Sequence, residues 1–306
     1  MKSTTLPLSQ RIPSASTLLP YLALTAAVFF WGASFPAGRV AVTQLHPQAV
    51  MFCRMVIACL LMAPFARKLI PTRFHRRDLK LLIPMVLLQP CFYYFLESNA
   101  LKLTTSSQAG VISASVPVFV ALGAWLFLKE KMTRNLALGL TISVAGVSVL
   151  TLFGEEALPG DNPILGNSLE FAAMACAAGN MILVKRLSRS YGPWTLTAMQ
   201  FVAGLIFFAP GIRYLIVAPH LLLQPDLFAA LSLLGIFASV GAFGLYNWSM
   251  SRLPATRASI FINLVPAVAV ILGWSLLGES LSPGQFAGAI LVGTGVLISQ
   301  KAPSNK

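Results

Sequence analysis

The sequence predicts an all-α membrane protein with ten transmembrane helices arranged as two inverted five-helix repeats. The first observation behind this prediction is composition. Hydrophobic residues make up 57% of the 306 residues, charged residues make up 10%, and the mean hydropathy is +0.77. A soluble domain carries about 25% charged residues, so this chain lacks the polar surface that a water-soluble fold needs.

The second observation is an internal duplication with an offset of 149 residues. Proline, tryptophan, leucine, glutamate and glycine all recur, in the pairs Pro117/Pro266, Trp125/Trp274, Leu128/Leu277, Glu130/Glu279, Gly139/Gly288 and Gly146/Gly295. Matches earlier in each half have offsets of 146 or 147 and are Gly32/Gly179, Arg39/Arg186, Pro47/Pro193 and Pro64/Pro210. Both copies lie in apolar segments, and duplicated membrane bundles are typical of secondary transporters.

Ten apolar runs are long enough to cross a hydrocarbon layer about 30 Å thick, which takes about 20 helical residues. They are 21–43, 47–66, 80–100, 105–128, 135–153, 166–187, 194–216, 227–250, 256–277 and 284–300. We expect a disordered cytoplasmic tail at 1–18, the first repeat at 19–153, an outer acidic linker at 154–165, the second repeat at 166–300 and a cytoplasmic tail at 301–306. No signal peptide is apparent.

The net charge of +13 is distributed as a topology signal. With the N-terminus inside, the inner segments collect 18 of the 22 basic residues, namely Lys2, Arg11, Arg67, Lys68, Arg73, Arg76, Arg77, Lys80, Lys129, Lys131, Arg134, Lys185, Arg186, Arg189, Arg252, Arg257, Lys301 and Lys306. Excess Lys and Arg mark the cytoplasmic side, so both termini are expected there. Because each half has five spans, the second half begins on the opposite side of the membrane from the first. Each span therefore runs in the opposite direction to its counterpart in the other half, which makes the repeats inverted.

Several segments resemble the ten-helix, EamA-type drug/metabolite transporters. They are the Trp31-Gly32-Ala33-Ser34-Phe35 run, the arginine of Arg54-Met55-Val56, and the block Val116-Pro117-Val118-Phe119 followed by Leu126-Phe127-Leu128-Lys129-Glu130-Lys131, with its second copy Val265-Pro266-Ala267-Val268 and Leu276-Leu277-Gly278-Glu279-Ser280. The resemblance covers almost the whole chain outside the tails. It implies a secondary transporter of a bacterial inner membrane that exports amino acids or other metabolites.

Four ionisable residues within the spans are candidates for a gate or an ion-pair cluster. Arg54 lies roughly 9–10 Å inside the outer boundary of its span, and Arg39, Glu97 and Glu170 lie about 5–6 Å inside theirs. Arginine forks that meet carboxylates would form an outer gate or bind a zwitterion. The alternative is that Arg39, Glu97 and Glu170 snorkel to interfacial water, and that Arg54 is a static structural brace.

The substrate cavity is expected near mid-membrane, between the two halves. Polar and aromatic residues of the spans are its candidate lining, and they are Trp31, Ser34, Tyr93, Tyr94, Ser113, Ser115, Asn180, Tyr246, Asn247, Trp248 and Asn263. A span asparagine must find a partner, so these amides are expected to face protein or cavity. Such a cavity has no fixed net charge and suits a neutral or zwitterionic solute with an apolar part.

The duplicated prolines and glutamates each have a structural interpretation beside the functional one. Pro117 and Pro266 interrupt helical hydrogen bonding, so they are hinge candidates or fixed kinks. Glu130 and Glu279 follow their spans directly, and their duplication suggests capping or pairing near a helix end. Gly284 and Gly288 form a GxxxG motif that permits close helix contact, within the bundle or between protomers.

Other classes of protein have less support. The chain has no HExxH, GxSxG or Gly-rich phosphate motif, so an intramembrane enzyme is a distant alternative, and no cofactor, metal site or nucleic-acid partner is expected. The expected partners are a small-molecule solute and the lipid bilayer, in a monomer or weak homodimer. Because no acid lies at mid-membrane, a uniporting exporter is favoured over a proton-coupled antiporter or importer.

Overall fold

The computed structural model describes residues 15–71, 75–128, 134–153, 161–250 and 263–299. All regular elements in these ranges are helical. The first half contains α1 (Ala15–Gln44), α2 (Pro47–Met62), η1 (Ala63–Phe65), α3 (Ala66–Leu69), η2 (Arg76–Asp78), α4 (Leu79–Val86), η3 (Leu87–Phe92), α5 (Tyr93–Leu103), α6 (Ser106–Ser113), α7 (Val116–Leu128) and α8 (Arg134–Leu152). The second contains α9 (Pro163–Leu187), α10 (Pro193–Phe208), η4 (Ala209–Gly211), α11 (Ile212–Val217), η5 (Pro219–Leu223), α12 (Pro225–Ser232), η6 (Leu233–Gly241), α13 (Ala242–Met250), α15 (Val265–Leu277) and α16 (Pro283–Ser299).

Eight stretches of the described chain are long and apolar enough to cross a membrane, and the two shorter apolar helices Val265–Leu277 and Pro283–Ile298 bring the number to ten. The ten-helix prediction is therefore confirmed, and most span boundaries agree within three residues. The first part of the predicted span 256–277 lies outside the described residues. Proline in the first turn begins α2, α9, α10, α12 and α15, where its missing N–H has no helical partner to lose.

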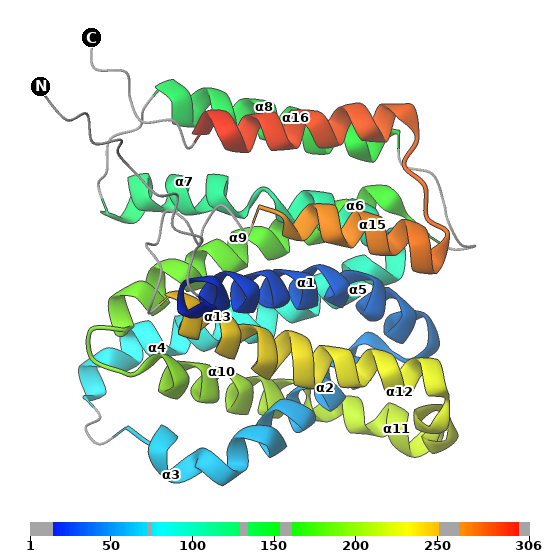
Figure 1. Ribbon diagram of the computed structural model, residues 1–306. Helices are drawn as coiled ribbons and strands as arrows, with labels where there is room; N and C mark the ends of the chain where they lie inside the picture. Colours follow the sequence, from blue (N-terminus) through cyan, green and yellow to red (C-terminus); the bar gives the residue numbers. More distant parts are fainter. Residues whose placement is uncertain (1–14, 72–74, 129–133, 154–160, 251–262, 300–306) are drawn as a thin grey trace, which may run out of the picture.

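The helices run roughly parallel to one another in a single bundle (Figure 1). We call the end at which α1 begins and α16 finishes the terminal end, and the opposite end the far end. Helix α1 runs from the terminal end to the far end, whereas its counterpart α9 runs the other way. The described chain thus begins and finishes at the same end of the bundle, as an even number of crossings requires.

The packing of the helices follows the pseudo-twofold symmetry of inverted repeats. Helix α1 packs against α13 and α15 of the second half, and its counterpart α9 packs against α5 and α7 of the first half. Two further pairs, α8 with α16 and α2 with α10, join each helix to its own counterpart. The two halves therefore form one intertwined bundle.

Duplicated glycines explain the close contact of α8 with α16. A Cβ atom on Gly146 would lie 2.6 Å from the Val292 backbone nitrogen, and one on Gly288 would lie 2.6 Å from that of Leu150. Gly295 is equally close to the Ser143 nitrogen. Only glycine allows backbones to approach in this way. The GxxxG motif thus lies against α8 within the same chain.

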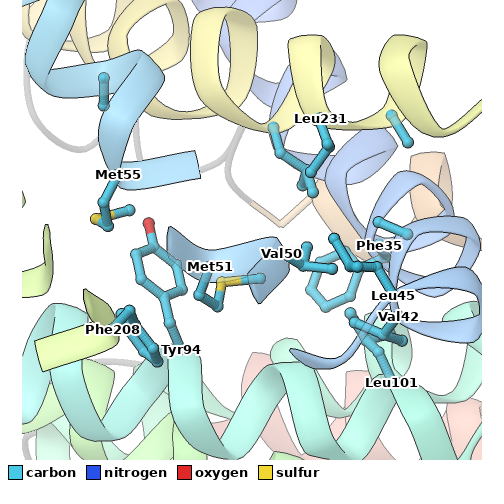
Figure 2. Close-up of a cluster of buried hydrophobic side chains, with 14 of the residues drawn as sticks. Phe35, Val42, Leu45, Val50, Met51, Met55, Tyr94, Leu101, Phe208 and Leu231 are labelled. Carbon is cyan, nitrogen blue, oxygen red and sulfur yellow. The ribbon is translucent and has the colours of Figure 1, made fainter. Parts of the chain in front are cut away.

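The largest apolar core lies between α1, α2, α5, α10 and α12. Figure 2 shows side chains from these helices converging, among them Phe35, Met51, Tyr94, Phe208 and Leu231. Tyr94 stands on α5 with its hydroxyl directed away from that helix. This aromatic residue therefore brings a polar group into an apolar core, where it needs a partner.

The duplicated prolines lie at the start of helices. Pro117 is the second residue of α7, after a turn at Ala114 and Ser115 that separates α6 from α7. Pro266 is the second residue of α15, after a turn at Asn263 and Leu264. We expected each proline to interrupt a helix near its middle. In the structure the break comes before the proline, and the proline lies in the first turn of the helix that follows. Their hinge role remains a prediction.

The glycine contact between α8 and α16 predicts the effect of two matched substitutions. Gly288→Ala places a methyl group against the α8 backbone and should lower the free energy of unfolding by about 1–3 kcal/mol. Gly293→Ala on the same helix meets no atom within 4 Å and should be neutral or stabilising. Thermal unfolding midpoints of the two purified variants in one detergent test this difference. Equal midpoints would show that the helices separate without cost.

Candidate functional site

Arg39 forms a buried ion pair at the far end. Its Nη2 atom lies 2.7 Å from each carboxylate oxygen of Asp161, and Nη1 donates to the Leu101 carbonyl at 2.8 Å. Arg39 is 4% exposed and Asp161 is 7% exposed. The backbone N–H of Asn162 donates to the Leu103 carbonyl at 2.9 Å and holds this segment against α5. The snorkelling alternative for Arg39 is therefore wrong, because its charge is neutralised inside the protein.

Glu279 caps a helix of the other repeat at the same end. Its carboxylate accepts from the backbone N–H groups of Ser106 and Ser107, both at 2.8 Å, and from their hydroxyls at 2.8 and 2.6 Å. These N–H groups begin α6 and have no partner within the helix. Gly278 has φ +67°, which turns the chain after α15 toward α6. The capping prediction is confirmed for Glu279, while Glu130 lies outside the described residues.

The pKa of His46 reflects the positive charge around this end of the bundle. His46 lies between α1 and α2 and stacks on Tyr214 with ring centroids 3.8 Å apart. Burial, together with the charges of Lys102 and Arg213, lowers the pKa of its imidazole. The ring therefore favours its neutral form, in which it accepts a hydrogen bond from the Gln48 N–H at 3.2 Å.

Arg54 lies at the centre of a charged cluster that joins the repeats. Its Nε donates to the Ser239 hydroxyl at 2.9 Å, and Nη1 lies 3.9 Å from Glu97 Oε2. The guanidinium also covers the Tyr94 ring at 4.2 Å from its centroid. Tyr93 donates to Glu97 Oε1 at 2.5 Å. Arg54 thus connects α2 and α5 of the first half to η6 of the second.

Glu170 is the fourth charged candidate and has a different environment. It lies on α9 with no exposed surface, and neither carboxylate oxygen has a hydrogen-bond partner among the described residues. Its charge interacts with that of Glu97 on the neighbouring helix α5. The predicted layer of two arginines and two glutamates is therefore divided, because Arg39 pairs with Asp161 and only Arg54 remains near the two glutamates. The burial of Glu97 and Glu170 also makes the snorkelling alternative wrong for both.

Three side-chain amides meet where the third span is interrupted. Asn180 of α9 donates to Gln89 Oε1 at 2.9 Å, and Gln200 of α10 donates to the Asn180 Oδ1 and to the Gln89 carbonyl, both at 2.9 Å. Gln89 has φ −145° and ψ 123°, so the helix is broken there and its carbonyl is free to accept. Asn180 therefore faces protein rather than lipid.

The other cavity candidates lie at several places. Trp31 contacts Phe243 and Tyr246 with ring centroids 5.4 and 5.2 Å apart. Ser34 donates to the carbonyl of Trp31 at 2.6 Å, and Ser113 donates to that of Gly110 at 2.7 Å, so both bond within their own helices. Ser115 is buried, Trp248 is half-buried and Asn263 is exposed. The Asn247 side chain lies outside the described part of the chain.

Sequence reasoning missed the partners of its own candidates. Asp161 was assigned to the outer linker, and Gln89, Gln200 and Ser239 were not singled out. The rule applied to span asparagines holds for glutamine as well, since any amide in a span needs a partner. That rule would have singled out Gln89 and Gln200. It would also have singled out Gln108 and Asn167, since the Asn167 amide donates to Gln108 Oε1 at 2.8 Å.

Comparison with known proteins places these features in a wider context. A model of the EamA-like transporter family matches residues 18–152 and again residues 164–300. An uncharacterized transporter of Archaeoglobus fulgidus is 29% identical over 284 residues, covering 91% of this chain and 97% of the relative. A Chlamydia muridarum protein named an S-adenosylmethionine/S-adenosylhomocysteine transporter is 27% identical over 268 residues, covering 84% and 83%. A solved crystal structure superposes with a TM-score of 0.57 at 16% identity over 92% of this chain and 95% of its own, which shows a shared fold.

The Arg39–Asp161 pair predicts a large loss of stability when one partner is neutralised. Asp161→Asn leaves a buried guanidinium without a counter-ion and should lower the free energy of unfolding by about 3–5 kcal/mol. The double variant Arg39→Met/Asp161→Leu should recover most of it. Asp226→Asn, which neutralises an exposed acid at the far end, is the control and should cost less than about 1 kcal/mol. Thermal unfolding of the three variants measures these differences. If Asp161→Asn lost as little stability as Asp226→Asn, the Arg39–Asp161 pair would not stabilise the fold.

Proposed function

The chain belongs to the EamA-like transporter family, and we propose that it exports amino acids or similar small amphipathic metabolites by alternating access between its repeats. The protein is a multi-pass membrane protein and a transporter. The solute, the direction and the cellular membrane are parts of the proposal. Inverted repeats of this kind move solutes by rocking one half against the other.

The observation that carries the proposal is the composition of the region between the repeats. Arg39 pairs there with Asp161 and Arg54 with Glu97, while Asn180, Gln89 and Gln200 supply uncharged donors and acceptors. Trp31 of α1 and Tyr246 of α13, whose rings contact each other, supply aromatic surface between the repeats. Amides and aromatic rings suit a zwitterion with an apolar side chain. Such a solute would pass where Trp31, Tyr93, Tyr94, Asn180 and Tyr246 lie.

The far end supports a closed gate in this conformation. Glu279 of the second repeat and Ser106 and Ser107 of the first are bonded to each other, and all three are buried. Because the bonds join the two repeats, separating the repeats at this end breaks them. We propose that this separation admits or releases solute.

The orientation is proposed from the charges of the described residues. Exposed basic residues gather at the terminal end, in α3 and η2, at the start of α4 and α8 and around the end of α9, namely Arg67, Lys68, Arg76, Arg77, Lys80, Arg134, Lys185, Arg186 and Arg189. The positive-inside rule makes this end cytoplasmic. We therefore propose a location in the cell membrane, the inner membrane of a bacterium, with both termini in the cytoplasm.

A second solute class follows from one relative. The Chlamydia muridarum protein is named for S-adenosylmethionine and S-adenosylhomocysteine. Both solutes carry an α-amino acid group together with an aromatic base, so they share the recognition chemistry proposed here. They belong in the same screen as the amino acids.

Solute exchange in proteoliposomes tests the function. Vesicles are preloaded with unlabelled amino acids, and the entry of labelled neutral and aromatic amino acids and of S-adenosylmethionine is measured. Asn180→Leu should lower exchange about 10-fold or more, because it removes a hydrogen-bond partner from each of two half-buried amides. Asn99→Leu is the matched control, since that amide bonds only within α5. No exchange by folded protein would refute the solute class, and equal rates for the two variants would remove the amide cluster from the pathway.

A further inference from the structure

Glu170 is the one acidic side chain of the described core that has neither a counter-ion nor a hydrogen bond. Asp161 binds Arg39, Glu279 accepts four hydrogen bonds, and Glu97 has Tyr93 and Arg54. Glu170 is more deeply buried than any of them, at 0% exposure. An unpaired carboxylate without hydrogen bonds is the least favourable state that a buried acid can adopt.

The charges around Glu170 do not compensate it. The titratable groups that interact with it are Glu97, which has the same sign, and Tyr93, whose hydroxyl is already donated to Glu97. On α5 the other titratable residues are Tyr94 and Lys102. Of the other elements packed on α9, η3 carries the thiol of Cys91, and α6 and α7 carry no titratable residue. α4 and α8 carry only Lys80 and Arg134, both at the terminal end. The cluster of Arg54, Glu97 and Glu170 therefore has one positive charge for two carboxyl groups.

We propose that Glu170, with Glu97 as its neighbour, is an exchangeable proton-binding site and that the proton is the coupling ion of transport. In the occluded conformation a proton is bound to one carboxyl oxygen of Glu170, and the cluster is neutral. Opening admits water, the O–H bond breaks, the proton passes to water, and the cluster gains one negative charge. The vacated carboxylate then binds the ammonium group of a solute, and release of that solute restores the proton.

The placement of the site explains how proton and solute exclude each other. Glu170 and Asn180 lie ten residues apart on α9, and Glu97 and Gln89 lie eight residues apart along the third span. A solute held by the amide cluster thus lies on the same two helices as the acidic pair. The proton and the ammonium group of the solute would each neutralise the same negative charge, that of the Glu170 carboxylate. The site therefore binds one of them at a time. This coupling rests on the proposed function, whereas the proton site itself does not.

Proton release from the purified protein in detergent tests the site without any solute. Difference titration of the wild type against Glu170→Gln over about pH 5 to 9, above the range of exposed carboxyls, should show one additional proton per chain in the wild type. Asp226→Asn is the control, because it removes one exposed acid and leaves the buried cluster intact. Superimposable curves for wild type and Glu170→Gln would overturn the proposal, whether the group is always ionised or always protonated.

Flux measurements then test the coupling. With a solute that the wild type exchanges, Glu170→Gln should slow exchange, because it removes the carboxylate that binds the ammonium group, and should abolish the stimulation of net flux by a pH gradient. Unchanged stimulation would refute coupling through Glu170. If no solute exchanges in the wild type, the proposed function fails, and the titration still decides on the proton site.

Discussion

The absence of water inside a membrane-spanning bundle is the constraint on which this structure depends. Each buried charge must be compensated by a counter-ion or by hydrogen bonds from another part of the chain, because solvent is not available to hydrate it. Arg39 meets this requirement through Asp161 in the connection before α9, Arg54 through Glu97 and Ser239, and Glu279 through the groups at the start of α6. Polar bonds therefore help to specify which helices are neighbours, together with the glycine contact that joins α8 to α16.

These bonds also explain how a bundle of two halves can change shape. Apolar contacts between helices have little directionality, so they tolerate small rotations. The bonds between Glu279 and α6, by contrast, depend on direction, so the proposed separation of the repeats at the far end would have to break them. The glycine contact of α8 with α16 keeps two counterpart helices together at backbone distance. A fixed pair beside a breakable closure is what a rocking movement requires.

The ten spans could be predicted from the sequence because their apolar runs are continuous and proline marks several helix starts. The capping role of Glu279 followed from its duplication. The ion pairs were harder, because a depth along one helix says nothing about rotation around it. Arg39 and Glu97 were assigned similar depths, yet the connection before α9 places Asp161 against Arg39. A partner that comes from a loop cannot be found by counting residues along spans.

The symmetry of the scaffold is not matched by its chemistry. Gln200 lies 146 residues after Arg54, the offset that also relates Pro47 to Pro193, so the two are counterparts on α2 and α10. Arg54 binds η6 in the eighth span, and Gln200 binds η3 in the third, both at π-helical interruptions. Equivalent helices α2 and α10 thus each donate a hydrogen bond to an interrupted span, from the charged side chain of Arg54 in one half and the neutral side chain of Gln200 in the other. Glu97 corresponds to Tyr246 at the 149-residue offset, and Glu170 corresponds to Ala23 at the 147-residue offset.

Inversion therefore relates the backbones of the two halves, while the counterparts of Arg54, Glu97 and Glu170 are uncharged residues. If both halves carried the charges, the bundle would have to bury a second unpaired acid. If neither did, nothing would distinguish a loaded carrier from an empty one electrostatically. The symmetric scaffold therefore contains one charged cluster, around Arg54, and one neutral cluster, around Gln200. Arg54 and Gln200, which occupy equivalent positions on α2 and α10, show this difference between the two halves.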